Sequence, residues 1–475
     1  MGPNYQRPVI DSPSSWRFED KEAKDVANTA WWEQFNDQVL NELITIALKE
    51  NKDIKIAAAR VEEFLGRYGT TRAALFPQIA AGASASRDRI TEKGSAPFSP
   101  VVENPSSSYQ AFLSGSWEID IWGRLRRSTE AARADLLSTE EGRSTVILTL
   151  VSSVASSYVN LRDLDKQLEI SHRTAKAREE SYNLFKLRFE GGLISELELS
   201  QVKSEYEQAL ATIPLLEKSI ALQENSLSVL LGKNPGPIPR GKTVDELLLP
   251  TVPQGLPSDL LERRPDIRQA EQDLIAANAR IGVAKSLYFP TISLTGFFGW
   301  ASKDLSNLFT GPAKTWNWTV PATLPIFTGG ALSGQVQSAE AIQQQTLLRY
   351  QQVIQTAFRE VEDSLADQRL TKEQLKAQAR QVEALRNYAQ IARLRYENGY
   401  TSYIEVLDAE RSLFNAELSY TQTQAVLFQA LVNLYKSIGG GWVIEAERQS
   451  VLTNAPSNQN SVPSPSAQPA KTEVQ

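Results

Sequence analysis

Four segments alternate between apolar and polar side chains, which is the pattern of an amphipathic β-strand. In residues 108–120, alternate positions from Tyr109 to Ile119 are apolar or small, and the positions between them are polar except for Phe112. The same pattern predicts strands at 78–87, 108–120, 291–300 and 316–325. Each segment is about ten residues long and several carry Trp or Tyr, as membrane β-strands do. A soluble sheet half covered by helices has the same periodicity, so alternation alone leaves both interpretations open.

Two long stretches without proline, 106–213 and 326–455, contain narrow apolar stripes at spacings of three and four residues. Such stripes predict amphipathic helices with water on most of their surface. Both stretches are interrupted by residues that favour the left-handed conformation at a helix end, namely Gly191, Gly192, Asn398 and Gly399. Each long helix therefore turns back into a second helix, and the tips of both hairpins are expected far from the strands.

The chain is built from two copies of one unit. The motif "LFPQI" at 75–79 recurs as "YFPTI" at 288–292, an offset of 213 residues, and "LRFEGG" at 187–192 recurs as "LRYENG" at 394–399, an offset of 207. Internal similarity of this kind indicates a repeated structural unit. The change of offset predicts a longer loop between the first two strands, and the residues there are rich in Pro, Ser and Gly.

The repeat divides the chain into five regions. These are an N-terminal segment expected to pack around the middle of the molecule, repeat 1, an inter-repeat linker, repeat 2, and a C-terminal segment with a disordered tail: 1–36, 37–232, 233–263, 264–439 and 440–475. Each repeat begins with a helix that precedes its two strands. The other predicted helices are 122–189 and 195–231 in repeat 1, and 265–286, 329–397 and 402–437 in repeat 2.

The amino-acid composition excludes most kinds of catalytic and metal-binding site. The 475 residues carry a formal net charge of −6, which gives no reason to expect nucleic acid as a partner. The sequence has no cysteine and one histidine, His172, which excludes disulfides, thiolate sites and multi-histidine metal centres. His172 lies in a charged helical stretch without a recognisable nucleophile or orienting group. We therefore predict no enzyme, no cofactor and no metal site.

The segment "GPIPRGKT" at 236–243 matches the pattern of a phosphate-binding loop. That chemistry needs backbone N–H groups between a buried strand and a helix, whereas this segment follows a predicted helix and contains two prolines. We interpret it as part of the linker between the repeats.

Four amphipathic strands cannot cross a bilayer as an open sheet, because the edges would leave backbone groups unpaired in hydrocarbon. A closed membrane barrel needs at least about eight strands. A membrane interpretation therefore requires an oligomer of two or three chains, in which the polar strand faces surround water and the helices continue the tube on one side of the membrane.

Several motifs resemble the outer membrane factor family, the TolC-like channels of Gram-negative bacteria. They are "GPNYQRP", "SWEIDIWGRLRR", "LPSDLLERRPDI" and the "GGGW" at 439–442, and they occur in the order of the family from about residue 3 to 442. The resemblance implies a mixed α+β membrane protein. In that family a homotrimer forms a twelve-stranded β-barrel, four strands per chain, continuous with a long α-helical barrel and surrounded at its middle by a small equatorial domain.

The resemblance also implies a location and partners. The expected location is the outer membrane, with the helical barrel in the periplasm and outer membrane lipid around the strands. The expected function is the passive exit duct of a tripartite efflux pump for drugs or other small molecules. A periplasmic adaptor, expected at the hairpin tips, and an inner-membrane transporter, expected to be proton-driven, would complete the pump. The exit duct of a type I protein secretion system and a soluble helical scaffold are the alternatives.

A gate at the helix tips follows from the same resemblance. Carried over by position, Ile404 and Asp408 would face the pore, while Arg411 and Tyr396 would join the tip network. The spacing of Ile404, Asp408 and Arg411 also places these three on one helix face. Glu397 departs from relatives that carry a basic residue there, so the ion-pair partners stay open. Relatives of the lipoprotein type carry an acylated cysteine just upstream of the first motif, and this chain has none. Lipid anchoring, including palmitate, is thus an expectation for the native protein.

Overall fold

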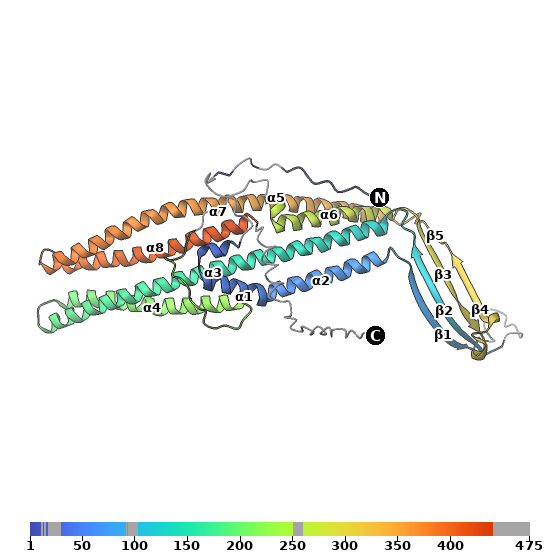
Figure 1. Cartoon of the computed structure of the whole chain (residues 1–475), viewed down its shortest axis with the longest axis horizontal. Coiled ribbons are helices and arrows are strands. Elements are labelled where there is room, and N and C mark those ends of the chain that lie inside the picture. The colour runs from blue at the N-terminus through green and yellow to red at the C-terminus, as the bar shows by residue number, and fades with distance from the viewer. Residues whose placement is uncertain are drawn as a thin grey trace, which may run out of the picture.

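The structure is a computed structural model that describes residues 1–10, 13, 16–17, 30–91, 93, 103–249 and 260–439. The predicted disordered tail at 440–475 and most of the long loop between the first two strands lie outside the described residues. The molecule is elongated, with a β-sheet at one end and the tips of two helical hairpins at the other (Figure 1).

The sheet contains β1 (Gln78–Asp88), β2 (Ser106–Glu118), β3 (Thr291–Ser302) and β4 (Lys314–Thr319). They are antiparallel and lie in the order β1-β2-β3-β4, so strands from both repeats form one sheet. The pairing β2 with β3 joins the two copies, because these strands are more than 170 residues apart in the sequence.

The fourth predicted strand, 316–325, is not continuous. The structure has β4 up to Thr319 and a short β5 (Ala322–Thr323), with Val320 and Pro321 between them. Proline has no N–H for a strand ladder, although the Pro321 carbonyl still accepts the amide of Ser293 at 3.2 Å. The prediction of one unbroken strand was wrong because it gave the alternation more weight than the proline.

The predicted strand 108–120 ends at Glu118, two residues early, because the next side chains cap a helix. The carboxylate of Asp120 accepts the backbone amides of Leu125 and Arg126 at 3.0 and 2.9 Å. It thereby satisfies N–H groups in the first turn of α3, which have no partner within the helix. Glu118 accepts two hydrogen bonds from the guanidinium of Arg124, at 3.0 and 2.6 Å.

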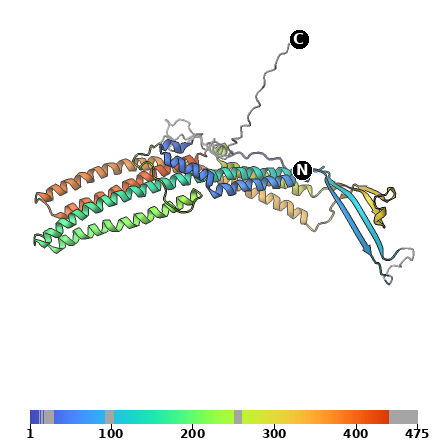
Figure 2. The ribbon, with the colours of Figure 1, turned by 60° about the horizontal axis from the view of Figure 1, so that its bottom comes forward.

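Eight α-helices occur in the described part of the chain, four before residue 250 and four after it. They are α1 (Gln38–Glu50), α2 (Lys52–Ala73), α3 (Arg124–Glu190), α4 (Glu196–Leu230), α5 (Leu260–Arg263), α6 (Pro265–Ser286), α7 (Ala331–Glu397) and α8 (Tyr403–Ser437). α3 and α7 have 67 residues each and are therefore about 100 Å long. α3 turns into α4 and α7 into α8, and both hairpins point away from the sheet in both views (Figures 1 and 2).

The two repeats end in the same way. Gly232 follows α4 with φ of +71°, and Gly439 follows α8 with φ of +91°. A side chain on Gly232 would overlap the backbone of Glu50, and one on Gly439 would overlap Arg264. Both positions therefore need glycine for the backbone conformation and for a close approach.

Equivalent side chains hold these two joints. Asn51, at the start of α2, donates its amide to the carbonyl of Leu230 at 2.9 Å, and Arg264, at the start of α6, donates to the carbonyl of Ser437 at 3.0 Å. The donors differ by 213 residues and the acceptors by 207, the same offsets as the sequence motifs. The sequence repeat is thus a repeat of packing.

The largest hydrophobic core lies at the middle of the molecule. The short 3-10 helix η1 (Trp31–Phe35) inserts there: Trp31 stacks on Tyr435 at 5.0 Å, and Phe35 meets Phe428 edge-to-face at 5.7 Å. Of the predicted N-terminal segment 1–36, residues 1–10 lie instead along α6 towards the sheet (Figure 1). One described helix, α3, has a window long and apolar enough to cross a bilayer, and 56% of that window is buried inside the protein, as in a core helix.

The segment 236–243 packs against the same core. Its backbone amides at Gly241 and Lys242 donate to the Tyr158 hydroxyl and the Asp37 carboxylate, both at 2.9 Å. Tyr158 in turn donates to Asp37 at 2.8 Å. Groups of this chain therefore already accept hydrogen bonds from two of the N–H donors of this segment, which are then not available to a phosphate.

Candidate functional site

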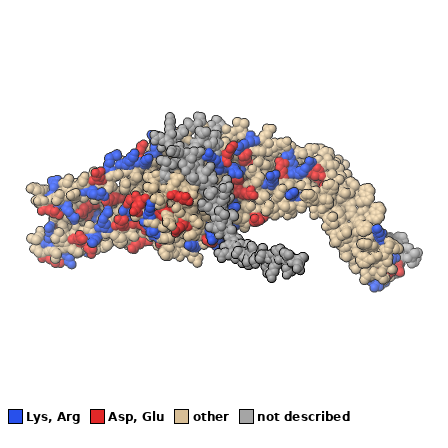
Figure 3. Space-filling view, in the orientation of Figure 1, with Lys and Arg blue, Asp and Glu red and all other residues tan. Residues whose placement is uncertain are grey.

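The sheet has one apolar face and one polar face, as the alternation predicts. Its register places the apolar side chains together: Ile79, Tyr109, Leu113, Trp117, Ile292, Leu294, Phe298, Trp300, Trp316 and Trp318. The surface over the strands is free of charge along most of its length, and charged side chains gather at the far end (Figure 3). An uncharged band with aromatic residues, bounded by charges, is the surface that a lipid bilayer requires.

The opposite face carries small polar side chains. It is lined by Gln78, Ser84, Gln110, Ser114, Ser116, Thr295, Asn317 and Thr319. Two aromatic residues, Phe112 and Phe297, share this face with them. Among the described strands, β1 and β4 form the two edges of the four-stranded order, and neither edge is paired within the chain.

At the far end of the molecule, each hairpin tip is a tight turn around glycine. Gly192 and Gly399 have φ of +69° and +74°, and a side chain on either would meet nothing within 4 Å. The predicted neighbours Gly191 and Asn398 come directly before them and are the C-cap residues of α3 and α7. Ser195 is the N-cap of α4 and forms a capping box with Glu198, which the helix periodicity did not predict.

A small aromatic core joins the two hairpins just above the tips. Phe185 of α3 packs between Tyr396 and Tyr403 of the second hairpin, with ring centroids 6.2 and 4.2 Å away. The guanidinium of Arg188 donates a hydrogen bond of 2.9 Å to the Tyr396 hydroxyl. This bond and the ring contacts connect α3 to α7 and α8 at the place where the hairpins would separate.

The four predicted gate residues divide into two groups. Ile404, Asp408 and Arg411 lie on the exposed face of α8, where Ile404 is 56% exposed and Arg411 donates to Asp408 at 2.8 Å. Tyr396 does not reach this face, because its ring lies in the aromatic core and its hydroxyl binds Arg188. The partner Arg188 was not predicted. Its contact spans 208 residues and leaves no trace in the periodicity of either helix.

A partly buried ionic cluster lies farther from the tips and involves four helices. Arg178 of α3 is 4% exposed and binds Glu205 of α4 through its carboxylate at 3.0 Å and its carbonyl at 2.7 Å. Glu410 of α8 lies 3.6 Å from Arg393 of α7. Burial raises the pKa of Glu410, and the two arginines oppose this rise. These groups stabilise each other only while the helices stay packed, since an unpaired buried charge is costly.

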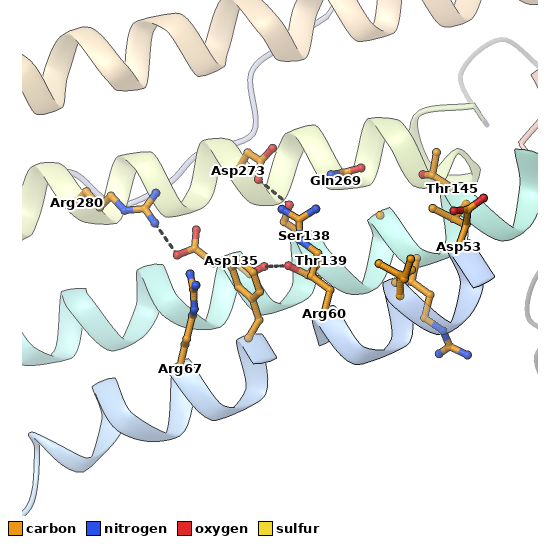
Figure 4. Close-up of a pocket in the computed structure, with 16 residues that line it drawn as sticks. Asp53, Arg60, Arg67, Asp135, Ser138, Thr139, Thr145, Gln269, Asp273 and Arg280 are labelled. Carbon is orange, nitrogen blue, oxygen red and sulfur yellow. Dashed lines mark hydrogen bonds and ion pairs between the residues drawn. The ribbon is translucent and has the colours of Figure 1, made fainter. Parts of the chain in front are cut away.

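A polar groove of 900 Å³ runs over α3 between α2 and α6 (Figure 4). Ion pairs and hydrogen bonds cross it, including Arg280 to Asp135 at 2.5 Å and Ser138 to Asp273 at 2.6 Å. Arg60 lies at its α2 side. In the described residues, no group of three or more His, Asp or Glu side chains is arranged to hold a metal ion. We assign this groove to helix packing.

Comparisons with known proteins agree with this architecture. The family model "Outer membrane efflux protein" matches residues 43–233 and 256–440. The chain is 37% identical to the "Toluene efflux pump outer membrane protein TtgC" of Pseudomonas putida over 93% of this chain and 92% of the relative. It is 36% identical to the "Cation efflux system protein CusC" of Escherichia coli over 93% and 95%.

Solved structures of similar proteins cover nearly the whole chain. A crystal structure of CusC matches with a TM-score of 0.83 at 35% identity, covering 93% of this chain and 99% of that one. The open state of the MtrE outer membrane channel of Neisseria gonorrhoeae matches with a TM-score of 0.85 at 31% identity, covering 93% and 98%.

Proposed function

The chain belongs to the outer membrane efflux protein family, and on this premise we propose that three copies close one twelve-stranded barrel in the outer membrane. It is an efflux channel of the Gram-negative outer membrane. The finer proposal is that the four long helices of each copy continue the barrel as a water-filled tube through the periplasm, with no catalytic chemistry along the way.

The observation that carries closure by several copies is the pair of open edges at β1 and β4, and with four strands per chain three copies make the twelve strands proposed. In hydrocarbon these backbone groups need partners, and β4 of one copy can supply them to β1 of the next. Apolar side chains on the outer face of α4 support the same assembly. Leu215, Leu222 and Val229 recur every seven residues and are 62%, 58% and 63% exposed. A stripe of this kind favours packing against a helix of a neighbouring copy.

Efflux of small molecules is the favoured transport role. Relatives carry the names of toluene, antibiotic and cation efflux systems, and these names favour a pump duct over a protein secretion duct. We propose that a periplasmic adaptor docks at the hairpin tips around Gly191, Gly192, Asn398 and Gly399. A proton-driven inner-membrane transporter would supply the energy.

The gate is proposed at the tips of the second hairpin. Ile404 and Asp408 are exposed on a face of α8 that the described residues leave open, so three copies around an axis can bring them together. Three carboxylates in a ring attract cations. Tyr396 and Arg188 would not line the pore; their hydrogen bond would hold the second hairpin against the first.

Residues 1–10 support the proposed lipid anchor. The nitrogen of Met1 donates to the carbonyl of Trp122 at 3.0 Å, which places residue 1 at the junction of sheet and helices. Arg127 holds the carbonyl of Met1 and the side chain of Asn4, at 3.2 and 2.6 Å. An acyl chain on a residue just upstream of this segment would lie close to the strands.

The assembly is tested with protein extracted from membranes. We expect extraction to require detergent, native mass spectrometry to give a trimer, and planar bilayers to show discrete conductance steps. A soluble helical scaffold would instead be extracted without detergent, and a monomer without conductance would refute the proposed channel.

A further inference from the structure

Phe112 and Phe297 are large apolar side chains on the polar face of the sheet. Every other side chain of the described strands on this face is small or polar. The two rings lie on neighbouring strands near the middle of the sheet, with centroids 6.5 Å apart and planes at 69°. Phe297 is 40% exposed although the opposite face of the same strand offers an apolar environment.

The sheet is hollowed around these rings. A depression of 840 Å³ is lined by both phenylalanines together with Gln78, Gln110, Asn317 and Thr319. Its floor includes Gly115 and Gly296, and no charged side chain lines it. A hollow with two aromatic rings and a few amide and hydroxyl groups has the composition of a small-molecule site.

Packing within the sheet explains Phe112 in part but not Phe297. The Phe112 ring covers Gly82 on the neighbouring strand, where an added Cβ would come within 2.8 Å of the ring. Gly299, the partner of Phe112 on β3, likewise leaves room for it. Phe297 faces Ser114 and Asn317 instead, so no glycine requires its ring.

We propose that Phe112 and Phe297 form a binding subsite inside the barrel for small molecules that carry an uncharged aromatic ring. The proposal rests on the proposed trimer, in which this face lines the lumen and three copies supply six rings. The rings offer edge-to-face contacts to an aromatic solute, while the surrounding amides and hydroxyls bind its polar substituents. The subsite is shallow and open, so it holds a solute briefly and does not obstruct the duct.

The test is photolabelling of the detergent-purified trimer with benzophenone-4-carboxylate, whose charge keeps it out of the micelle. Adducts are read by peptide mass spectrometry on β1, residues 78–88, which contain neither phenylalanine. We expect labelling of β1 in the wild type, competed by excess benzyl alcohol. In Phe297→Ser the labelling falls about three- to tenfold, the effect of losing one aromatic contact.

Phe298→Ser is the matched control. Phe298 is the next residue of the same strand, is also 40% exposed, and lies on the opposite face. Its replacement leaves the labelling of β1 unchanged. If Phe297→Ser does not assemble, Phe297→Leu keeps an apolar side chain and still lowers the labelling.

The outcomes separate this inference from the proposed function. Trimers that conduct but show equal labelling in wild type and Phe297 variants overturn the subsite alone. Protein that neither forms trimers nor conducts overturns the channel, and the subsite with it. Equal losses in the Phe297 and Phe298 variants also overturn the subsite, because they indicate a general change of the sheet.

Discussion

Removing one oxygen atom, with Tyr396→Phe, tests whether the link between the hairpins holds the gate. The substitution deletes the acceptor of the 2.9 Å hydrogen bond from Arg188. It keeps the ring, and with it the contacts to Phe185 and Tyr403 at 6.2 and 4.9 Å. Any change in gating therefore reports the bond and not the packing of the aromatic core.

The expected effect follows from the strength of the bond. A hydrogen bond to a charged group contributes about 1.5–3 kcal/mol, and the lower value applies because Arg188 is partly exposed. In a trimer that opens as a unit, three lost bonds amount to about 4.5 kcal/mol. Each 1.4 kcal/mol is tenfold, so the ratio of open to closed channels rises by up to roughly a thousandfold.

The assay is single-channel recording in planar bilayers, with open probability as the readout. Tyr388→Phe is the control, because Tyr388 lies on the same helix, is 40% exposed and is not part of the aromatic core. We expect long openings in Tyr396→Phe and wild-type behaviour in Tyr388→Phe. An unchanged open probability in folded, trimeric Tyr396→Phe would refute the assignment of the Arg188 bond to the gate.

Three further substitutions test the remaining arguments. Asp408→Ala removes the proposed acidic ring, so the preference for cations falls; an unchanged reversal potential in bilayers counts against the ring. Burial raises the pKa of Asp163 from 3.8 to about 6, so the wild type loses stability as the pH rises between these values. Asp163→Asn therefore increases the free energy of unfolding at pH 7 by up to about 3 kcal/mol and has no effect near pH 3. Thermal unfolding at each pH measures this, and a gain in stability that does not depend on pH would contradict it. Gly232→Ala lowers the free energy of unfolding by at least about 1–2 kcal/mol in the same measurement because φ is positive there, whereas the control Gly66→Ala, in open space on α2, is neutral or slightly stabilising. Equal effects of the two substitutions would mean that the joint after α4 does not need glycine.

Much of the fold follows from periodicity. Alternation places β1 and β3 within two residues of their observed ends, because the apolar side chains of a membrane strand face one way along its whole length. Proline at 265 likewise marks the start of α6. The end of β2 was missed because it depends on Asp120, whose carboxylate caps α3, and alternation carries no information about caps.

Less of the candidate site could be predicted from the sequence. Helical spacing places Ile404, Asp408 and Arg411 on one face, which is a local property of α8. The bond between Arg188 and Tyr396 and the hollow around Phe112 and Phe297 join residues that are more than 180 positions apart. Such contacts depend on how the two repeats pack against each other, and the periodicity of a single helix or strand gives no information about that packing.

The repeat nevertheless explains why the proposed gate belongs to the second hairpin alone. At the offset of 207, the first copy has Leu197, Gln201 and Ser204 where the second has Ile404, Asp408 and Arg411, and it has Phe189 where the second has Tyr396. The exposed apolar residue recurs in both copies, at 68% and 56% exposure, because both hairpin tips have the same backbone. The carboxylate, its arginine and the hydroxyl that binds Arg188 are present once. Two hairpins with identical tips would open and close together. Because the Asp408 carboxylate and the Tyr396 hydroxyl occur in the second hairpin alone, that hairpin can move against the first.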